Sequence, residues 1–263
     1  MDRIFRIEQK GQQEYVLGND DDTGWCRLVG DPFGDYSRGP AIENEGVRVI
    51  APVQPSKIVA VGLNYRDHAR EMNKPLPEEP LIFLKPSTTV IGLNDPIVMP
   101  SQAGRVDYEA ELGIVIQKRA KAVAAAEAAH YILGLTCVND VTARELQTRD
   151  VQYTRAKGFD TFAPIGPCIA VGLDGSALDV ESLVNGERRQ ASNTRELIFG
   201  LHRLVEFISS VMTLLPGDVI ATGTPSGVGP VAPGDRVMVR VEGIGELVNE
   251  VVGDASVRGG LTS

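Results

Sequence analysis

The chain has 263 residues, enough for one sizeable domain and a small second one. Its formal net charge of −9 argues against nucleic acid or an anionic membrane as a partner, and 43% hydrophobic with 23% charged residues is typical of a soluble enzyme. The three cysteines form neither a disulfide framework nor a zinc motif, and no apolar run could span a bilayer. We therefore expect a cytoplasmic enzyme.

The first part of the chain predicts a small module rich in β-structure. Residues 3–7 and 14–17 alternate as short strands around Gly11, and two nearby prolines, Pro52 and Pro55, mark a linker. We expect an N-terminal module over residues 1–54 and a catalytic domain over residues 55–263.

The next segment predicts an acid–base pair. Residues 57–62 form a continuous apolar run typical of a buried strand. If the chain after Asn64 is helical, His68 and Glu71 stand three residues apart and can touch, so the carboxylate would orient the imidazole as a general base. The alternative is an ordinary surface pair. Residues 73–80 hold three prolines and predict a loop that could let this segment act as a lid.

Residues 106–116 predict the strand around which the rest is organised. Side chains two residues apart on a strand share a face, so Glu109 and Glu111 point the same way, and Gly113 and Val115 continue that face into a core. Two carboxylates at the edge of a core need a metal, a cationic partner or a proton. The alternative is a solvated strand edge.

A third carboxylate follows the next predicted strand, residues 134–139. Asp140 ends that strand, and residues 142–145 fit a capping box that would start a short helix. Together, Glu109, Glu111 and Asp140 would give oxygen ligands alone, which suits a hard cation such as Mg²⁺ or Mn²⁺. A local turn aspartate is the alternative for Asp140.

The remaining elements complete a strand-rich pattern, which predicts an α+β fold. Lys157 falls in a predicted polar loop, where a surface lysine is the alternative to a functional one. In chain order we expect a strand at 80–86, an alanine-rich helix at 122–133, a polar loop at 153–162, a hairpin at 180–190, a helix at 196–214, a glycine-rich loop at 223–229 and a hairpin at 236–252.

Six of these segments, in this order, resemble the fumarylacetoacetate hydrolase family. Each is weak alone, but the ordered set is specific and spans roughly residues 57–252. The segments are VGLNYRDH at 61–68, FLKPS at 83–87, YEAEL at 108–112, NDVTAR at 139–144, AKGFD at 156–160 and GTPSGVG at 223–229.

The resemblance implies a mixed β-roll with peripheral helices and a homodimer. It implies that Glu109, Glu111 and Asp140 are the metal ligands, and that a lid His–Glu pair and a lysine near the metal take part in catalysis. It further implies a substrate site lined by three more side chains. The pair and the lysine match His68, Glu71 and Lys157, and the lining residues match Arg144, Gln147 and Thr224.

The implied reaction is Mg²⁺-dependent chemistry on a small anionic 2-oxo or 2,4-dioxo acid through a metal-stabilised enolate. Our leading expectation is C–C bond hydrolysis of an acylpyruvate. Decarboxylation of oxaloacetate, and isomerisation or decarboxylation of hydroxylated dienedioates from aromatic catabolism, use the same enolate. A different class stays open: a catalytically silent protein that binds small acids, or one that holds a metal only for structure.

Overall fold

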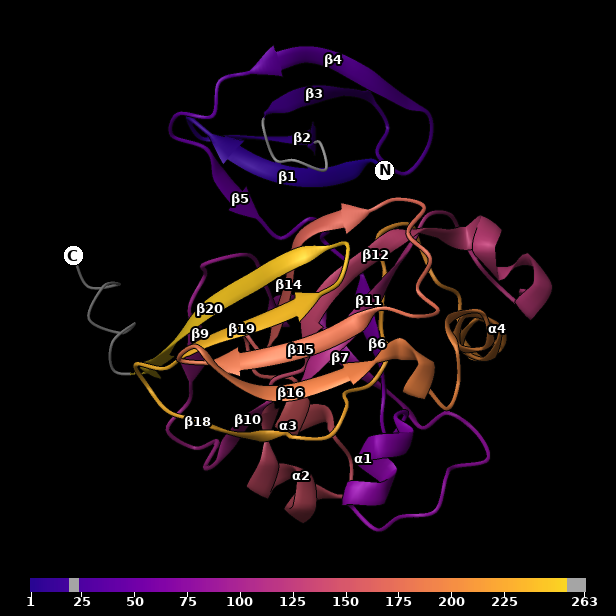
Figure 1. The fold of residues 1–263 in the computed structure, drawn as a ribbon, viewed down its shortest axis with the longest axis vertical. Helices are drawn as coiled ribbons and strands as arrows, with labels where there is room; N and C mark the ends of the chain where they lie inside the picture. Colours follow the sequence, from indigo (N-terminus) through magenta and orange to yellow (C-terminus); the bar gives the residue numbers. More distant parts are fainter. Residues whose placement is uncertain (19–23, 255–263) are drawn as a thin grey trace.

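The computed structural model describes residues 1–18 and 24–254 and has the strand-rich α+β architecture expected from the sequence. Five strands form the N-terminal part, which lies as a separate lobe above the body in Figure 1. They are β1 (Arg3–Gln9), β2 (Gln12–Gly18), β3 (Trp25–Gly30), β4 (Tyr36–Ile42) and β5 (Arg48–Ile50).

Within the described residues, the body contains the remaining strands and four short α-helices. The strands are β6 (Lys57–Val61), β7 (Ile82–Pro86), β8 (Val90–Ile91), β9 (Ile97–Met99), β10 (Val106–Tyr108), β11 (Ala110–Ile116), β12 (Ile132–Asn139), β13 (Thr142–Ala143), β14 (Ala163–Ala170), β15 (Asp179–Val184), β16 (Glu187–Asn193), β17 (Val219–Ala221), β18 (Gly229–Val231), β19 (Arg236–Val241) and β20 (Gly245–Gly253). The helices are α1 (Arg66–Glu71), α2 (Arg144–Asp150), α3 (Thr154–Lys157) and α4 (Leu201–Val211), with 3₁₀ turns η1 (Ser87–Thr89), η2 (Ala125–Tyr131) and η3 (Thr194–Glu196).

The described strands form three sheets, a large central sheet and two smaller ones. The central sheet has the order β4-β3-β2-β1-β14-β12-β11-β17-β6-β7, with β5 on β1 and β8 on β14. Because β1 pairs with β14, the N-terminal strands continue the sheet of the body. The two smaller sheets have the orders β13-β10-β18 and β16-β15-β19-β20-β9. The boundary proposed at residue 54 stays a prediction.

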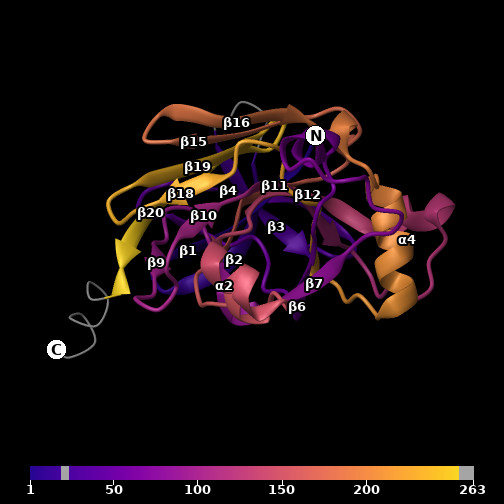
Figure 2. The same ribbon diagram turned by 90° about the horizontal axis from the view of Figure 1, so that it is seen from below.

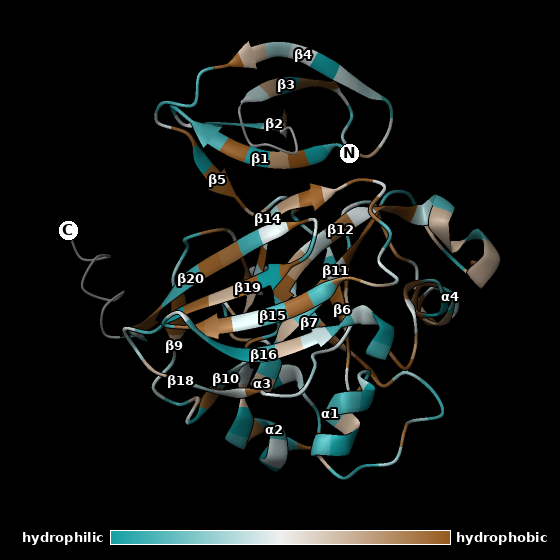
Figure 3. Cartoon of the chain, viewed as in Figure 1, coloured by the Kyte–Doolittle hydropathy of each residue, from teal (hydrophilic) through white to brown (hydrophobic). Residues whose placement is uncertain are grey.

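The core lies between the central sheet and the five-stranded sheet. Figure 2 shows β15, β16, β19 and β20 as a layer against β11 and β12, and Figure 3 shows hydrophobic colour gathered on the central strands. Leu112 and Cys137 of the central sheet share one buried cluster with Val180, Val239 and Leu247 of the other layer. This packing stabilises β11, which contains Glu111 and follows Glu109, and β12, which ends just before Asp140.

Four local predictions need correction. The alanine-rich stretch forms only η2, because Ile132 already pairs with Ile116 in β12. The predicted long helix is confined to α4, because Leu197 and Ile198 bond to the chain at residues 64–65 instead. The predicted capping box does not form: Thr142 donates its hydroxyl to the carbonyl oxygen of Asp140 and lies in β13. The predicted polar loop at 153–162 contains α3.

Among residues 1–18 and 24–254, every helix is too short or too polar to cross a membrane.

The homodimer stays a prediction, and the edge of the central sheet supplies a surface on which to test it. Among the described strands β7 pairs only with β6, and Leu84 of β7 and the preceding Leu81 are exposed. Val151, 84% exposed, lies two residues before Tyr153, whose ring contacts Phe83 of β7. An unpaired strand edge with exposed apolar side chains is a common site of association between chains.

We propose that this edge is covered by a second copy of the chain. Sedimentation should give twice the 28.3 kDa chain mass, and Leu84→Glu should shift the protein toward the single-chain species, because a buried charge opposes association. Val29→Glu, at an exposed apolar position on β3, is the matched control and should leave the assembly intact. A wild-type protein that sediments only at 28.3 kDa at micromolar concentration would contradict the dimer.

Candidate active site

The register of two neighbouring strands brings the three predicted carboxylates together. Ala110 of β11 pairs with Asn139 of β12, so Glu109 and Glu111 flank the point where β12 ends at Asp140. The backbone N–H of Asp140 donates to the carbonyl oxygen of Glu109 at 2.9 Å. One oxygen from each carboxylate lies within 4.8 Å of the other two, and all three residues are buried. The predicted cluster is therefore present, and it lies inside the fold and not at a solvated edge.

Three cationic side chains surround this carboxylate cluster. Lys157 of α3 donates to Glu109 Oε2 at 2.8 Å and to Asp140 Oδ2 at 2.6 Å, so the alternative of a surface lysine is wrong. Arg144, the first residue of α2, donates from Nη2 to Glu109 Oε1 at 2.6 Å. Lys85 of β7 is fully buried and donates to Asp140 Oδ1 and to the carbonyl oxygen of Val141.

Sequence reasoning quoted Lys85 only within a matching stretch and assigned it no place in the site. The alternation of side chains along β7 could have identified Lys85: Leu84 points outward, so Lys85 points inward with Phe83. The ring of Phe83 also lies 5.1 Å from the ammonium group of Lys157. This face of β7 therefore brings together two lysines, and a lysine at the inward position of an apolar strand is seldom fully buried without a carboxylate partner.

These neighbours shift the carboxylate pKa values in opposite directions. Burial alone raises the pKa of Glu109, but the charges of Lys157 and Arg144 outweigh it and bring the pKa down to about 2. Among the described residues no cationic side chain bonds to Glu111, and the charge of Lys157 lowers its pKa only in part. Burial first, and then the charges of Asp140 and Glu109, raise the pKa of Glu111 well above its ordinary value.

The lysines respond to the same forces. Burial lowers the pKa of Lys157, but Asp140 and Glu109 outweigh this effect and raise it above its ordinary value. For Lys85, burial is the stronger effect and lowers the pKa although Asp140 opposes it. Lys157 is therefore held as an ammonium ion between two carboxylates.

The glycine-rich loop closes the cluster from the side of Glu111. The backbone N–H of Gly223 donates to Glu111 Oε2 at 2.8 Å. Gly223 has a φ of +97°, and a Cβ there would lie 2.8 Å from the Cβ of Asn64, so only glycine fits this close approach. The loop is thus shaped to present a backbone donor to a buried carboxylate.

The donor set fits a hard divalent cation. It consists of three carboxylates without a cysteine or histidine, which is the ligand chemistry of Mg²⁺ or Mn²⁺. Glu111 supports the same conclusion, because a positive ion beside it would offset the repulsion that raises its pKa. Glu109, Glu111 and Asp140 would hold such an ion.

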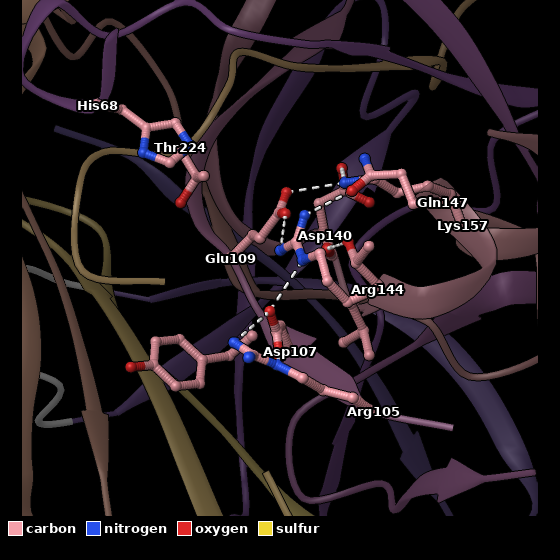
Figure 4. Close-up of polar contacts among 12 residues, drawn as sticks. His68, Arg105, Asp107, Glu109, Asp140, Arg144, Gln147, Lys157 and Thr224 are labelled. Carbon is pink, nitrogen blue, oxygen red and sulfur yellow. Dashed lines mark hydrogen bonds and ion pairs between the residues drawn. The ribbon is translucent and has the colours of Figure 1, made fainter. Parts of the chain in front are cut away.

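The predicted acid–base pair forms as the spacing indicated. His68 and Glu71 lie on α1, and the Nδ1 atom of His68 is 2.8 Å from Glu71 Oε2. The other oxygen of Glu71 accepts a hydrogen bond from the backbone N–H of Gly227 at 3.1 Å. The helix is therefore tied to the loop that also contacts Glu111, and Figure 4 shows His68 and Thr224 on the side of the site next to Glu109. Their catalytic roles stay predictions.

The predicted substrate-lining residues occupy two different settings. Arg144 donates from Nη1 to Gln147 Oε1 at 2.6 Å, so these two side chains act as a unit beside Glu109. Thr224 donates its hydroxyl to the carbonyl oxygen of Ala110 and accepts a hydrogen bond from Gln190, a residue that sequence reasoning did not single out. The Thr224 hydroxyl therefore fastens the loop to β11, and its contact with substrate stays a prediction.

Comparisons with known proteins agree with the fold and the site. Residues 57–252 match the sequence model of the fumarylacetoacetate hydrolase C-terminal domain. A 2-hydroxyhepta-2,4-diene-1,7-dioate isomerase from Mycobacterium marinum has a solved structure that is 43% identical, with a TM-score of 0.89 over 97% of this chain and 99% of that one. The chain belongs to the fumarylacetoacetate hydrolase family, as its motifs indicated, and is an enzyme of that family.

Two further relatives show the range of activities within the family. A mitochondrial oxaloacetate tautomerase of Bos taurus is 41% identical over 226 residues, which cover 81% of this chain and 72% of that protein. The fumarylacetoacetate hydrolase of Exiguobacterium antarcticum is 33% identical, with a TM-score of 0.87 over 96% of this chain and all of that one. Proteins named as isomerase, tautomerase and hydrolase thus all occur among the relatives of this chain.

The contacts of the carboxylates decide which substitution tests metal binding cleanly. Asp140→Asn would leave two buried lysines short of a partner and should lower the free energy of unfolding by about 3–5 kcal/mol. Glu111→Gln removes one charge next to a backbone donor only, so the fold should persist while Mn²⁺ affinity falls by about 100-fold or more. Calorimetric titration with Mn²⁺ and a thermal melt measure both.

Asp160→Asn, an exposed acid just beyond Lys157, is the matched control and should bind Mn²⁺ as the wild type does. Unchanged Mn²⁺ affinity in a folded Glu111→Gln variant would exclude Glu111 as a ligand.

Proposed function

We propose that the protein is a divalent-metal-dependent enzyme that acts on small anionic 2-oxo acids, and that its leading reaction is C–C bond hydrolysis of an acylpyruvate. The observation that carries this proposal is the buried cluster of three carboxylates and three cations beside a His–Glu pair. Such a cluster stabilises negative charge that develops on a substrate.

Charge balance supports an anionic substrate. The formal charges of Glu109, Glu111 and Asp140 cancel those of Lys85, Lys157 and Arg144. A bound Mg²⁺ ion would then leave a net charge of +2, and would supply the Lewis acid that stabilises an enolate. A dianionic 2-oxo acid would neutralise this charge.

The residues of the chain have distinct tasks in the proposed reaction. Lys157, held between Glu109 and Asp140, keeps a positive charge beside the reacting oxygen atoms. His68 accepts a proton from a water molecule, which attacks the distal carbonyl of the substrate. The bond between that carbonyl carbon and C3 then breaks, its electron pair forms the enolate of pyruvate, and a proton taken up at C3 completes the product. Glu71 orients the imidazole through Nδ1 and stabilises its charged form, while its contact with Gly227 holds α1 over the site.

A second candidate reaction is the interconversion of the enol and keto forms of oxaloacetate. It is favoured by the bovine relative named an oxaloacetate tautomerase, which covers 81% of this chain at 41% identity. Tautomerisation needs the same cluster and a group that moves a proton, but it needs no attacking water. The two candidates therefore differ in what His68 does.

Replacement of His68 separates these tasks. His68→Ala should lower kcat for acetylpyruvate cleavage by about 10²–10⁴-fold, the usual contribution of a positioned acid–base group. Decarboxylation of oxaloacetate, which needs no activated water, should fall much less. Glu71→Gln should give a milder loss than His68→Ala, because Glu71 orients the base and does not move the proton. The measurement is kcat for both substrates with Mg²⁺.

His130→Ala, at an exposed histidine in η2, is the control and should behave as the wild type. An equal loss on both substrates would contradict water activation by His68 and favour proton transfer to the enol. An unchanged kcat for both substrates would mean that His68 and Glu71 form only a surface contact and have no catalytic role. A wild-type protein that turns over none of these acids with Mg²⁺ would contradict the proposed function and favour a silent acid-binding protein.

A further inference from the structure

Arg144 divides its guanidinium group among three acceptors. Nη2 donates to Glu109 and Nη1 to Gln147, both at 2.6 Å, while Nε donates to Asp107 Oδ2 at 2.8 Å. Figure 4 shows Asp107 on the far side of Arg144 from Glu109. Asp107 therefore contacts Arg144 and lies outside the carboxylate cluster itself.

The position of Asp107 is fixed by the backbone on both sides. In β10 it pairs with Thr142 of β13 and with Pro230 of β18, and its side chain is 1% exposed. Arg105, half exposed, binds the same carboxylate through Nε at 2.7 Å and Nη2 at 3.1 Å. The carboxylate is thus buried, paired twice and held by the middle strand of a sheet, so it is a rigid reference point for Arg144.

The guanidinium group is flat, so a bond at Nε fixes the plane in which its two terminal nitrogens lie. With Nε on Asp107, only one terminal nitrogen contacts Glu109. Without Asp107, Arg144 could turn and pair with Glu109 through two nitrogens, the arrangement that arginine and carboxylate groups favour. Such a turn would withdraw its charge from the substrate side.

Exposure distinguishes Arg144 from the other two cations of the cluster. Its side chain is 28% exposed, whereas that of Lys157 is 3% exposed and that of Lys85 is fully buried. Arg144 is therefore the cation of the three that can reach a charged group at the open end of a substrate whose 2-oxo acid end lies at the buried carboxylates.

We propose that Asp107 is a positioning residue that holds Arg144 so that it binds the second carboxylate of a 2-oxo dicarboxylate. This inference rests on the proposed function and adds that 2-oxo acids with a second carboxylate bind more tightly than those with one. Asp107 contacts no substrate atom. Its effect is transmitted by Arg144 and is specific to substrates that carry the second carboxylate.

Two inert probes of equal carbon length test the inference by binding. 2-Oxoglutarate and 2-oxovalerate share the 2-oxo acid end, and only the first has a second carboxylate. In calorimetric titrations with Mg²⁺, the wild type should bind 2-oxoglutarate more tightly. Asp107→Asn keeps the shape of the side chain and removes its charge. It should raise the Kd for 2-oxoglutarate by about tenfold and change the Kd for 2-oxovalerate by less than about twofold, because only the charge-assisted bond from Arg144 to the second carboxylate is misplaced.

The neighbouring arginine provides the matched control. Arg105→Gln removes the other partner of Asp107 but leaves the Arg144 contact, so it should keep the wild-type preference. A double-mutant cycle tests whether the effect of Asp107 is transmitted through Arg144. In a protein that already carries Arg144→Gln, Asp107→Asn should raise the Kd for 2-oxoglutarate by less than about a further twofold. A thermal melt establishes that each variant is folded. If Asp107→Asn does not fold, Arg144→Lys replaces it, since lysine keeps the charge but cannot bind all three acceptors; it should lose the preference to the same extent.

The following results would each overturn the inference. These are equal weakening of both probes by Asp107→Asn, additive losses in the cycle, or an Arg144→Lys variant that keeps the full preference. A wild-type protein that binds neither probe would refute the proposed 2-oxo acid function itself, and the inference with it. Binding of both probes that Asp107→Asn leaves unchanged would refute the inference alone.

Discussion

Three carboxylates buried within 4.8 Å of one another are the constraint on which this structure depends. Each loses hydration, and each repels the other two, so the cluster is unfavourable unless positive charge surrounds it. The chain meets this requirement with cations from three separate elements: Lys85 from β7, Arg144 from α2 and Lys157 from α3. The arrangement of β7, α2 and α3 around the ends of β11 and β12 follows from that need.

The cations do not compensate the three carboxylates equally, and this difference bears on the chemistry of the site. Glu109 and Asp140 each bind two cationic side chains, while Glu111 receives a backbone N–H from Gly223. The low pKa of Glu109 and the raised pKa of Glu111 are two results of this one arrangement. A divalent cation at the cluster would supply the positive charge that Glu111 lacks, which is why the donor set fits a metal-dependent enzyme.

Local spacing made part of this site predictable. Glu109 and Glu111 are two residues apart on a strand, and His68 and Glu71 are three apart on a helix, so one periodicity places each pair. Lys85, Asp107 and Gln190 were missed because their partners lie 55, 37 and 34 residues away in the sequence, and only the tertiary fold brings them together. The α+β class followed from strand patterns, whereas the ends of η2 and α4 depended on backbone pairing with distant residues.

The central claim is that Glu109, Glu111 and Asp140 hold one divalent ion, and anomalous diffraction from crystals soaked in Mn²⁺ tests it most directly. The account predicts one anomalous peak per chain, with an oxygen atom of each of the three carboxylates at about 2 Å, close to the distance expected for Mg²⁺. A saturating soak that leaves this cluster without a peak, or that places the ion on other ligands, would contradict the account.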